Sequence, residues 1–213
     1  ESWYANTHEG NFRLAQTYAE PKMTITVPEL LAIRPSVHLA FVMFDIETSG
    51  FDADWDILLS ACIKPYGQPP VVFRADSYPT WETGRANDKA ITVDIAGELR
   101  KHAIVVGHYS KKFDVRFLRA KMFRHGLEPL PLMFGIDSWR IAWDNFKVSN
   151  RRMKSLSVFA QLGVEKSEPE GDRWMKAAFN GDKDAMEKIV AHNIECVTLL
   201  EKLACISFPY LKS

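Results

Sequence analysis

The sequence predicts an α/β domain in which helices pack on a mixed β-sheet. Three apolar stretches, at 38–45, 56–65 and 69–75, are separated by turns containing Gly or Pro and have the pattern of an antiparallel meander. After them, segments with helical periodicity alternate with short apolar strands. A meander followed by helix and strand in alternation describes a sheet that begins antiparallel and continues with parallel strands, flanked by helices.

The later elements follow from periodicity and end signals. Helical spacing and short apolar runs predict helices at 87–102, 111–126 and 182–204 and strands at 103–108 and 132–137. Asp182 is a good N-cap for the last helix. We expect the domain to occupy residues 37–213. Residues 1–36 are expected to be an N-terminal extension of unassigned role, with a short helix at 27–33.

Composition places limits on function. The chain has 213 residues, with 27 basic and 27 acidic side chains, so binding to a polyanion requires a local basic patch. Cys62, Cys196 and Cys205 lack disulfide or metal-type spacing and favour a reducing, cytoplasmic location. No apolar run approaches the ~20 residues that span a membrane. The first ten residues have no signal-peptide pattern.

Two acids stand one residue apart at the end of the first strand, in FVMFDIETSG. Alternate strand residues point to the same face, so Asp45 and Glu47 project side by side. Such a pair is unfavourable unless a cation lies between the carboxylates, and hard oxygen ligands suit Mg²⁺ or Mn²⁺. The alternative is an edge strand with two solvated acids.

Two further motifs follow in the chain. The stretch GHYSKKFD places Asp114 after a strand end, and the last predicted helix carries HNIECV from His192. In this order the three motifs resemble those of the DnaQ-like, or DEDD, 3′–5′ exonucleases, which have the ribonuclease H-like fold. The resemblance extends from about Leu39 to Leu203 and includes IDSW at Asp137, which is similar to the segment between the family's second and third motifs.

The resemblance implies a two-metal site for hydrolysis of phosphodiester bonds at nucleic-acid ends. Two Mg²⁺ or Mn²⁺ ions about 4 Å apart flank the scissile phosphate in such a mechanism. By resemblance, Asp45 bridges both ions, Glu47 binds the first and Asp114 holds the second. His192 serves the nucleophilic water, a task suited to imidazole near neutral pH. Taken alone, His192 could instead be a packing or capping residue.

The third motif departs from the family at Cys196, where Asp is expected. His192 and Cys196 are four residues apart and share a helix face, so the thiol occupies the expected ligand position. A thiol is a poor ligand for Mg²⁺. Either Glu195 replaces it, or the first ion is held weakly, or the alignment is shifted by one residue. A catalytically impaired nucleic-acid-binding module of the same fold is therefore an alternative function.

The expected substrate is single-stranded nucleic acid or a 3′ end, with DNA favoured over RNA. Tyr109 could stack on a base, beside basic side chains of the second motif. The expected nucleic-acid contacts are Thr48, Tyr109, Lys111, Lys112, Phe113 and Arg116, with Arg119 on the same face. An ordinary solvated helix face is the alternative, and for Lys147, Arg151, Arg152 and Lys154 an exposed loop is the simpler interpretation.

Other chemistries find less support in the sequence. It has no P-loop, dinucleotide-binding fingerprint, nucleophile elbow or paired CxxC motif. Trp139, Trp143 and Trp174 are expected in the core rather than at a ligand platform. A protein-interaction domain without a nucleic-acid role remains a third hypothesis, supported by the zero net charge and by Cys196.

Overall fold

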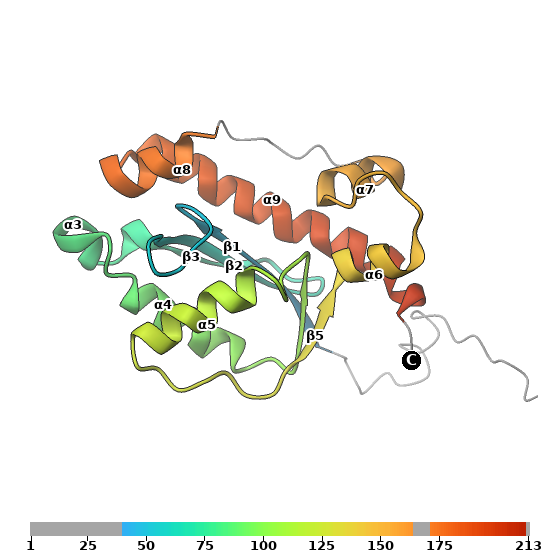
Figure 1. Cartoon of the computed structure of the whole chain (residues 1–213), viewed down its shortest axis with the longest axis horizontal. Helices are drawn as coiled ribbons and strands as arrows, with labels where there is room; N and C mark the ends of the chain where they lie inside the picture. Colours follow the sequence, from blue (N-terminus) through green and yellow to red (C-terminus); the bar gives the residue numbers. More distant parts are fainter. Residues whose placement is uncertain (1–39, 164–170, 212–213) are drawn as a thin grey trace, which may run out of the picture. The chain divides into compact units, whose positions relative to one another are not determined.

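The computed structural model describes residues 40–163 and 171–211, so the expected extension at 1–36 and its helix lie outside the described residues. A five-stranded sheet has the order β3-β2-β1-β4-β5 (Figure 1). The first three strands pair antiparallel, and β4 and β5 continue the sheet in parallel from β1. The predicted fold class is confirmed. The strands are β1 (Phe41–Thr48), β2 (Leu58–Pro65), β3 (Val71–Arg74), β4 (Ile104–Gly107) and β5 (Phe134–Asp137).

Helices cover both faces of the sheet. On one face lie α4 (Lys89–Leu99) and α5 (Asp114–Arg124), and the long α9 (Lys183–Ser207) crosses the other with α6 (Ser138–Asn145) and α7 (Met153–Phe159) (Figure 1). The shorter elements are η1 (Ala75–Ser77), α3 (Thr80–Gly84), α8 (Arg173–Met175), the π-helix η2 (Lys176–Asn180) and η3 (Phe208–Tyr210). No helix in the described part of the chain is long and apolar enough to cross a bilayer.

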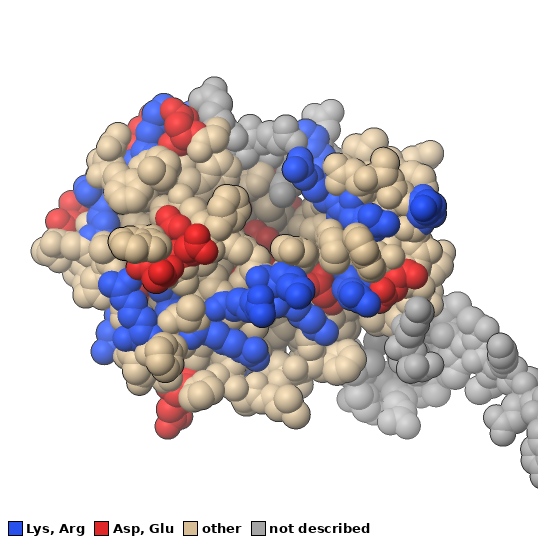
Figure 2. Space-filling model, in the orientation of Figure 1, with Lys and Arg blue, Asp and Glu red and all other residues tan. Residues whose placement is uncertain are grey.

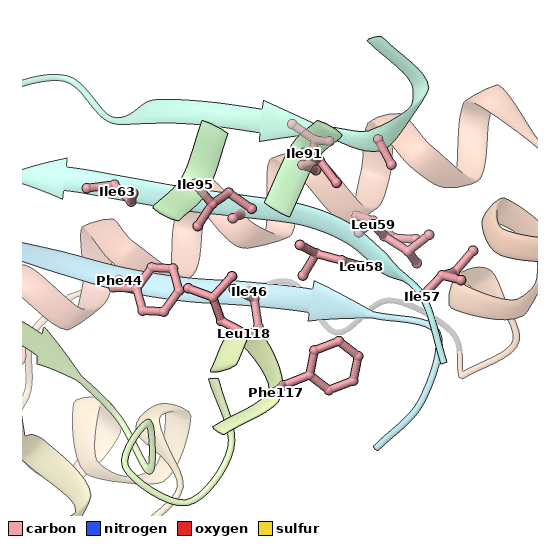
Figure 3. Close-up of a cluster of buried hydrophobic side chains, with 14 of the residues drawn as sticks. Phe44, Ile46, Ile57, Leu58, Leu59, Ile63, Ile91, Ile95, Phe117 and Leu118 are labelled. Carbon is pink, nitrogen blue, oxygen red and sulfur yellow. The ribbon is translucent and has the colours of Figure 1, made fainter. Parts of the chain in front are cut away.

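The alternation of β1 divides the core into two clusters. Phe44 and Ile46 pack with α4 and α5 in the first cluster, as Figure 3 shows. Phe41 and Met43 pack on the opposite face against α6, α7 and α9. Asp45 and Glu47 continue the second set, because strand side chains alternate between faces. Both acids therefore point toward α9.

The predicted helices differ from the structure at their ends, and α4 covers Lys89–Leu99 rather than 87–102. The Asp182 side chain accepts a hydrogen bond from the Ala185 amide at 3.0 Å, as an N-cap does, but α9 continues to Ser207 rather than ending at 204. The helix predicted from 111 begins only at Asp114. The preceding residues form a tight turn, in which Tyr109 has a φ of 65°.

Candidate active site

The carboxyl end of β1 has an open edge on the β4 side. β1 pairs with β4 from Phe41 only as far as Met43, which lies opposite Val106. Beyond this point the backbone amide of Ile46 donates to Asp114 Oδ1 at 3.0 Å. A carboxylate from the first turn of α5 thus takes the place of a strand partner. This contact brings Asp114 close to Asp45, although the two are far apart in sequence.

Asp114 is a buried acid beside another acid. Burial raises the pKa of Asp114 well above its usual value, and the charge of Asp45 raises this pKa further. Burying charge without a counter-charge is costly. The two carboxyl groups therefore form a site whose charged state needs a cation, and their oxygens are the hard ligands that Mg²⁺ and Mn²⁺ prefer.

Asp45 is also held by α9. The Asn193 side chain donates from Nδ2 to Asp45 Oδ2 at 2.7 Å, and its own Oδ1 accepts from the Ser60 hydroxyl at 3.0 Å. Asn193 is fully buried, so its amide orientation is fixed by these two partners. This chain of hydrogen bonds links β2, α9 and β1 and sets the direction of the Asp45 carboxylate. Sequence reasoning did not assign Asn193 or Ser60 to the site.

Glu47 is positioned by a tryptophan. Trp174 Nε1 donates to Glu47 Oε2 at 2.7 Å. The other oxygen, Oε1, lies 3.9 Å from His192 Nε2, and the rings of Trp174 and His192 meet edge to face at 6.2 Å. Trp174 is half-buried and packs against the first core cluster, as expected, and its Nε1 in addition contacts the polar site.

Cys196 lies beside the same two residues. One potential ligand atom from each of Glu47, His192 and Cys196 lies within 4.8 Å of the other two. Among the described residues, neither Asp45, Asp114 nor Glu195 belongs to this close group. Glu195 is only half-buried, whereas Cys196 is 2% exposed. The structure thus brings the thiol, and not the neighbouring carboxylate, to His192 and Glu47.

A second cysteine lies on the same face of the sheet. Cys62 of β2 is directly opposite Asp45 in the strand register. Burial raises the pKa of the Cys62 thiol, and the charges of Asp45 and Glu47 raise it further. Cys62 is therefore a neutral thiol, and it does not belong to the close group formed by Glu47, His192 and Cys196 among the described residues.

The turn after β4 holds Tyr109 in a strained backbone conformation. Asp137 fixes this turn, because its Oδ1 accepts from the Tyr109 amide at 2.8 Å and its Oδ2 from the Lys111 amide at 3.2 Å. Gly107 is needed at the strand end, because a Cβ there would lie 2.1 Å from Ser110 Cβ. Left-handed φ at a non-glycine residue is costly and clusters at functional sites.

An aromatic row begins at Tyr109 and follows α6. The Tyr109 ring meets Trp139 edge to face at 5.0 Å, and Trp139 stacks on Trp143 at 5.2 Å. The Arg151 guanidinium lies over Trp143, 4.6 Å from its centroid. Tyr109 is 44% exposed and Trp143 is 51% exposed. Trp143 is therefore not the core residue that was expected, and the row is partly exposed to solvent.

A pocket of about 370 Å³ adjoins Glu47. Thr48 and Phe51 from the end of β1, Phe113 before α5, and Trp174 line it together with Glu47. The Thr48 hydroxyl donates to the Gly50 carbonyl at 2.5 Å, so it is engaged within the turn.

Basic side chains flank the site on two sides. Figure 2 shows Lys and Arg gathered over α5 and again near α7, with a hollow between them in which acidic side chains are visible. The exposed basic residues of these segments include Lys111, Lys112, Arg116 and Arg119 on the first side and Lys147, Arg152 and Lys154 on the second.

Comparison with known proteins places these features in a family. A sequence-family model described as the RNase H superfamily matches residues 42–206. No curated protein sequence gives a significant match. The structure is similar to the family B DNA polymerase from the hyperthermophilic archaeon Pyrobaculum calidifontis, with a TM-score of 0.57 and 16% sequence identity. That match covers 79% of this chain and 25% of the polymerase chain, so this chain spans about a quarter of the polymerase's length.

Proposed function

Because the chain belongs to the RNase H superfamily over residues 42–206, we propose that it is a two-metal-dependent 3′–5′ exonuclease. The observation that carries the proposal is the convergence of Asp45, Glu47 and Asp114 at the end of β1, with His192 facing Glu47 from α9. Carboxylates placed so closely repel one another unless a cation lies between them. Groups with such perturbed pKa values cluster at functional sites, and a metal-dependent reaction gives a reason for this arrangement.

The residues present fit hard divalent ions. Asp45 and Asp114 would hold one Mg²⁺ or Mn²⁺, and Asp45 with Glu47 would hold the other. When bound, such ions activate a water and stabilise the leaving 3′-oxygen. Asn193 orients the Asp45 carboxylate and Trp174 orients that of Glu47, through the two hydrogen bonds of 2.7 Å. His192 Nε2, when neutral, can accept the proton of the attacking water.

Single-stranded ends are the proposed substrate. The pocket beside Glu47 has aromatic walls, from Phe51, Phe113 and Trp174, that suit a terminal base. The row from Tyr109 to Trp143 is partly exposed and supplies further aromatic side chains that a base could contact. Stacking on aromatic side chains is tolerant of sequence and requires unpaired bases. We therefore propose that a strand with a free 3′ end lies between the two basic surfaces.

Labelled oligonucleotides test the proposal directly. The full chain is incubated with Mg²⁺ or Mn²⁺ and with single-stranded or blunt duplex DNA and RNA, labelled at either end. We expect stepwise shortening from the 3′ end, faster on single strands and abolished by EDTA. Asp45→Asn should reduce the rate by about three orders of magnitude or more, since a neutral amide cannot replace a carboxylate shared by two ions.

A nearby acid supplies the control. Asp54→Asn removes an exposed carboxylate from the loop between β1 and β2 and should leave the rate unchanged. Circular dichroism of both variants checks that the fold is retained. A loss of less than about tenfold in Asp45→Asn would place the metal site elsewhere, and shortening from the 5′ end would contradict the assigned polarity.

Cys196 favours one alternative. With a thiol where the family resemblance expects a carboxylate, the fold could serve as a catalytically impaired nucleic-acid-binding module. The same experiment separates the two functions. Tight binding of the single strand with no shortening in either metal would support the binding module, and failure to bind any oligonucleotide would favour a protein-interaction domain.

A further inference from the structure

Three ligand atoms in the site differ in chemistry from the paired aspartates. Glu47, His192 and Cys196 offer one oxygen, one nitrogen and one sulfur, which lie within 4.8 Å of one another. His192 is 7% exposed and Cys196 is 2% exposed, so two of the three donors are shielded from solvent. Asp45 and Asp114 lie outside this group in the described part of the chain.

The geometry suits a single small ion. Bonds to nitrogen and to a carboxylate oxygen are roughly 2.0–2.2 Å long for Zn²⁺, so two such atoms on one ion lie at most about 4.2 Å apart, and roughly 3.4 Å apart in tetrahedral geometry. The 3.9 Å between His192 Nε2 and Glu47 Oε1 lies within that reach. Cys196 follows His192 by one helical turn and therefore approaches from the same face of α9. The three ligand atoms lie within 4.8 Å of one another, so a modest approach of the side chains brings all three onto one ion.

An outer hydrogen bond supports the same arrangement. Trp174 Nε1 donates a hydrogen bond to Glu47 Oε2, and the other carboxylate oxygen, Oε1, is directed toward His192. Carboxylates and imidazoles that bind metals are usually held by such partners, and these partners affect metal affinity by about 10–100-fold. Trp174 thus fixes the orientation that the three-donor group requires.

The donor set selects the class of ion. Mg²⁺ prefers oxygen ligands in octahedral geometry and binds thiols poorly. One sulfur, one nitrogen and one carboxylate oxygen, with a fourth position open, match Zn²⁺ and its neighbours. We propose that Glu47, His192 and Cys196 bind a borderline-soft divalent transition-metal ion of the Zn²⁺ class in preference to Mg²⁺.

This site has a consequence for hydrolysis, although its existence does not depend on hydrolysis. Glu47 cannot serve the carboxylate-bound Mg²⁺ or Mn²⁺ fully while it binds Zn²⁺ with Cys196 and His192. Zn²⁺ should therefore inhibit the nuclease proposed above, in competition with Mg²⁺. Cys196→Ser should weaken this inhibition by at least about tenfold in Zn²⁺ concentration, because the only soft donor of the group is removed.

Cobalt spectroscopy tests the binding without any assay of activity. The metal-free full chain is titrated with Co²⁺, whose bond to a thiolate gives a charge-transfer absorption in the near ultraviolet. We expect the absorption to saturate at one equivalent and to disappear when Zn²⁺ is added. It should be absent in Cys196→Ser and unchanged in Cys205→Ser, which removes the exposed cysteine. Zn²⁺ affinity by calorimetry should fall at least tenfold in Cys196→Ser only.

Two further measurements keep this proposal separate from the proposed function. Asp45→Asn should lose hydrolysis and keep the cobalt–thiolate absorption, because Asp45 is not one of the three donors. X-ray absorption of the wild-type Zn²⁺ complex should show one sulfur neighbour, which removes any dependence on the folding of Cys196→Ser. Absence of that sulfur, or an absorption that survives in Cys196→Ser, overturns the zinc-class site whether or not the chain is a nuclease.

Discussion

Among single residues, Asp114 is an acid whose ionisation is unfavourable in the folded protein. Its pKa is raised by burial and by the charge of Asp45. An acid with a raised folded-state pKa contributes stability that is present below its unfolded pKa of roughly 4 and is lost as pH rises through the folded pKa. The metal-free protein is therefore less stable at neutral pH than near pH 4 as far as this carboxyl group is concerned, and a cation bound beside Asp114 would offset that loss.

Asp114→Asn should stabilise the metal-free protein at neutral pH. The amide cannot ionise, and it keeps an oxygen that can accept from the Ile46 amide. We expect the Tm in EDTA to rise by a few degrees at pH 7, since 1 kcal/mol corresponds to roughly 2–4 °C for a chain of this size. The difference should shrink toward pH 4, where the wild-type carboxyl is protonated. Thermal unfolding from pH 4 to 8 measures it.

Asp144→Asn provides the matched control for this experiment. It removes a carboxylate that pairs with Arg140 along α6 in a more solvated setting. Its effect on Tm should be small at every pH, as for other surface ion pairs. A Tm for Asp114→Asn that is equal to or below the wild-type value at pH 7 in EDTA would show that the Asp114 carboxyl group is not a net cost to the metal-free protein.

Trp174→Phe should impair hydrolysis much more than stability. Phenylalanine keeps most of the ring but loses the Nε1–H that holds Glu47 Oε2. Outer partners of metal-binding carboxylates are worth about 10–100-fold in affinity or activity, so we expect a loss of that size, largest at low Mn²⁺. Trp55→Phe, at an 84% exposed position, is the control. Unchanged metal dependence in Trp174→Phe would mean that the Glu47 orientation is set by other contacts.

The candidate site residues predicted from the sequence differ from the residues that only the structure adds to the site. Asp45, Glu47, Asp114 and His192 stand in local patterns that can be read within a few positions. Trp174 and Asn193 act through hydrogen bonds to residues 127 and 148 positions away, and no local pattern encodes such contacts. The burial of Asn193 between Val190 and Val197 on α9 was the available signal, because a polar side chain on a buried helix face needs a partner.

Among the elements, strands and helices were predictable where periodicity decides them and less so at their ends. The three-strand meander and α9 follow from apolar pattern and from Asp182. The start of α5 was placed too early because Tyr109 and Ser110 form a turn that long-range hydrogen bonds to Asp137 impose. Helical propensity at Lys111 and Lys112 could not reveal that constraint.

Asp137 should be the most sensitive helix cap in the domain. It caps α6, accepting from the Trp139 and Arg140 amides at 3.1 and 3.3 Å, and also holds the amides of Tyr109 and Lys111. Asp137→Ala should cost about 2–3 kcal/mol, more than a simple cap, because several partly buried amides lose their acceptor together. Urea denaturation measures the loss.

The conservative variant separates the two roles of this residue. Asp137→Asn retains an oxygen in the Oδ1 position and loses the acceptor for Lys111, so it should be destabilised by about half as much. Asp137→Ala should also weaken single-strand binding, because the aromatic row begins in the turn that Asp137 fixes. Equal stability of the Ala and Asn variants would indicate that Asp137 acts through its charge rather than through its hydrogen bonds.

At the scale of the whole molecule, positive and negative charges are equal in number, but they gather on different parts of the surface. The 27 basic and 27 acidic side chains cancel, so no long-range attraction to nucleic acid follows from net charge. The basic surfaces over α5 and near α7 nevertheless border the hollow that contains the acids (Figure 2). The sequence identifies the basic residues but does not show that they lie on the same side of the domain, because they come from segments that only the fold brings together.

Binding of a single strand should therefore depend steeply on salt, and the dependence should come from this face. Each phosphate contact contributes about −0.7 to the slope of log K against log salt concentration for single strands. The double variant Lys112→Gln/Arg116→Gln, with both positions exposed before and within α5, should reduce the magnitude of this slope by about 1.4 if each residue contacts one phosphate.

The control is the double variant Lys183→Gln/Lys188→Gln. It removes the same charge from exposed positions on α9 and should leave the slope unchanged. Anisotropy titrations in EDTA, from 50 to 300 mM salt, measure binding without hydrolysis. Equal slopes for the two double variants would mean that net charge, and not a strand path along α5, governs the interaction.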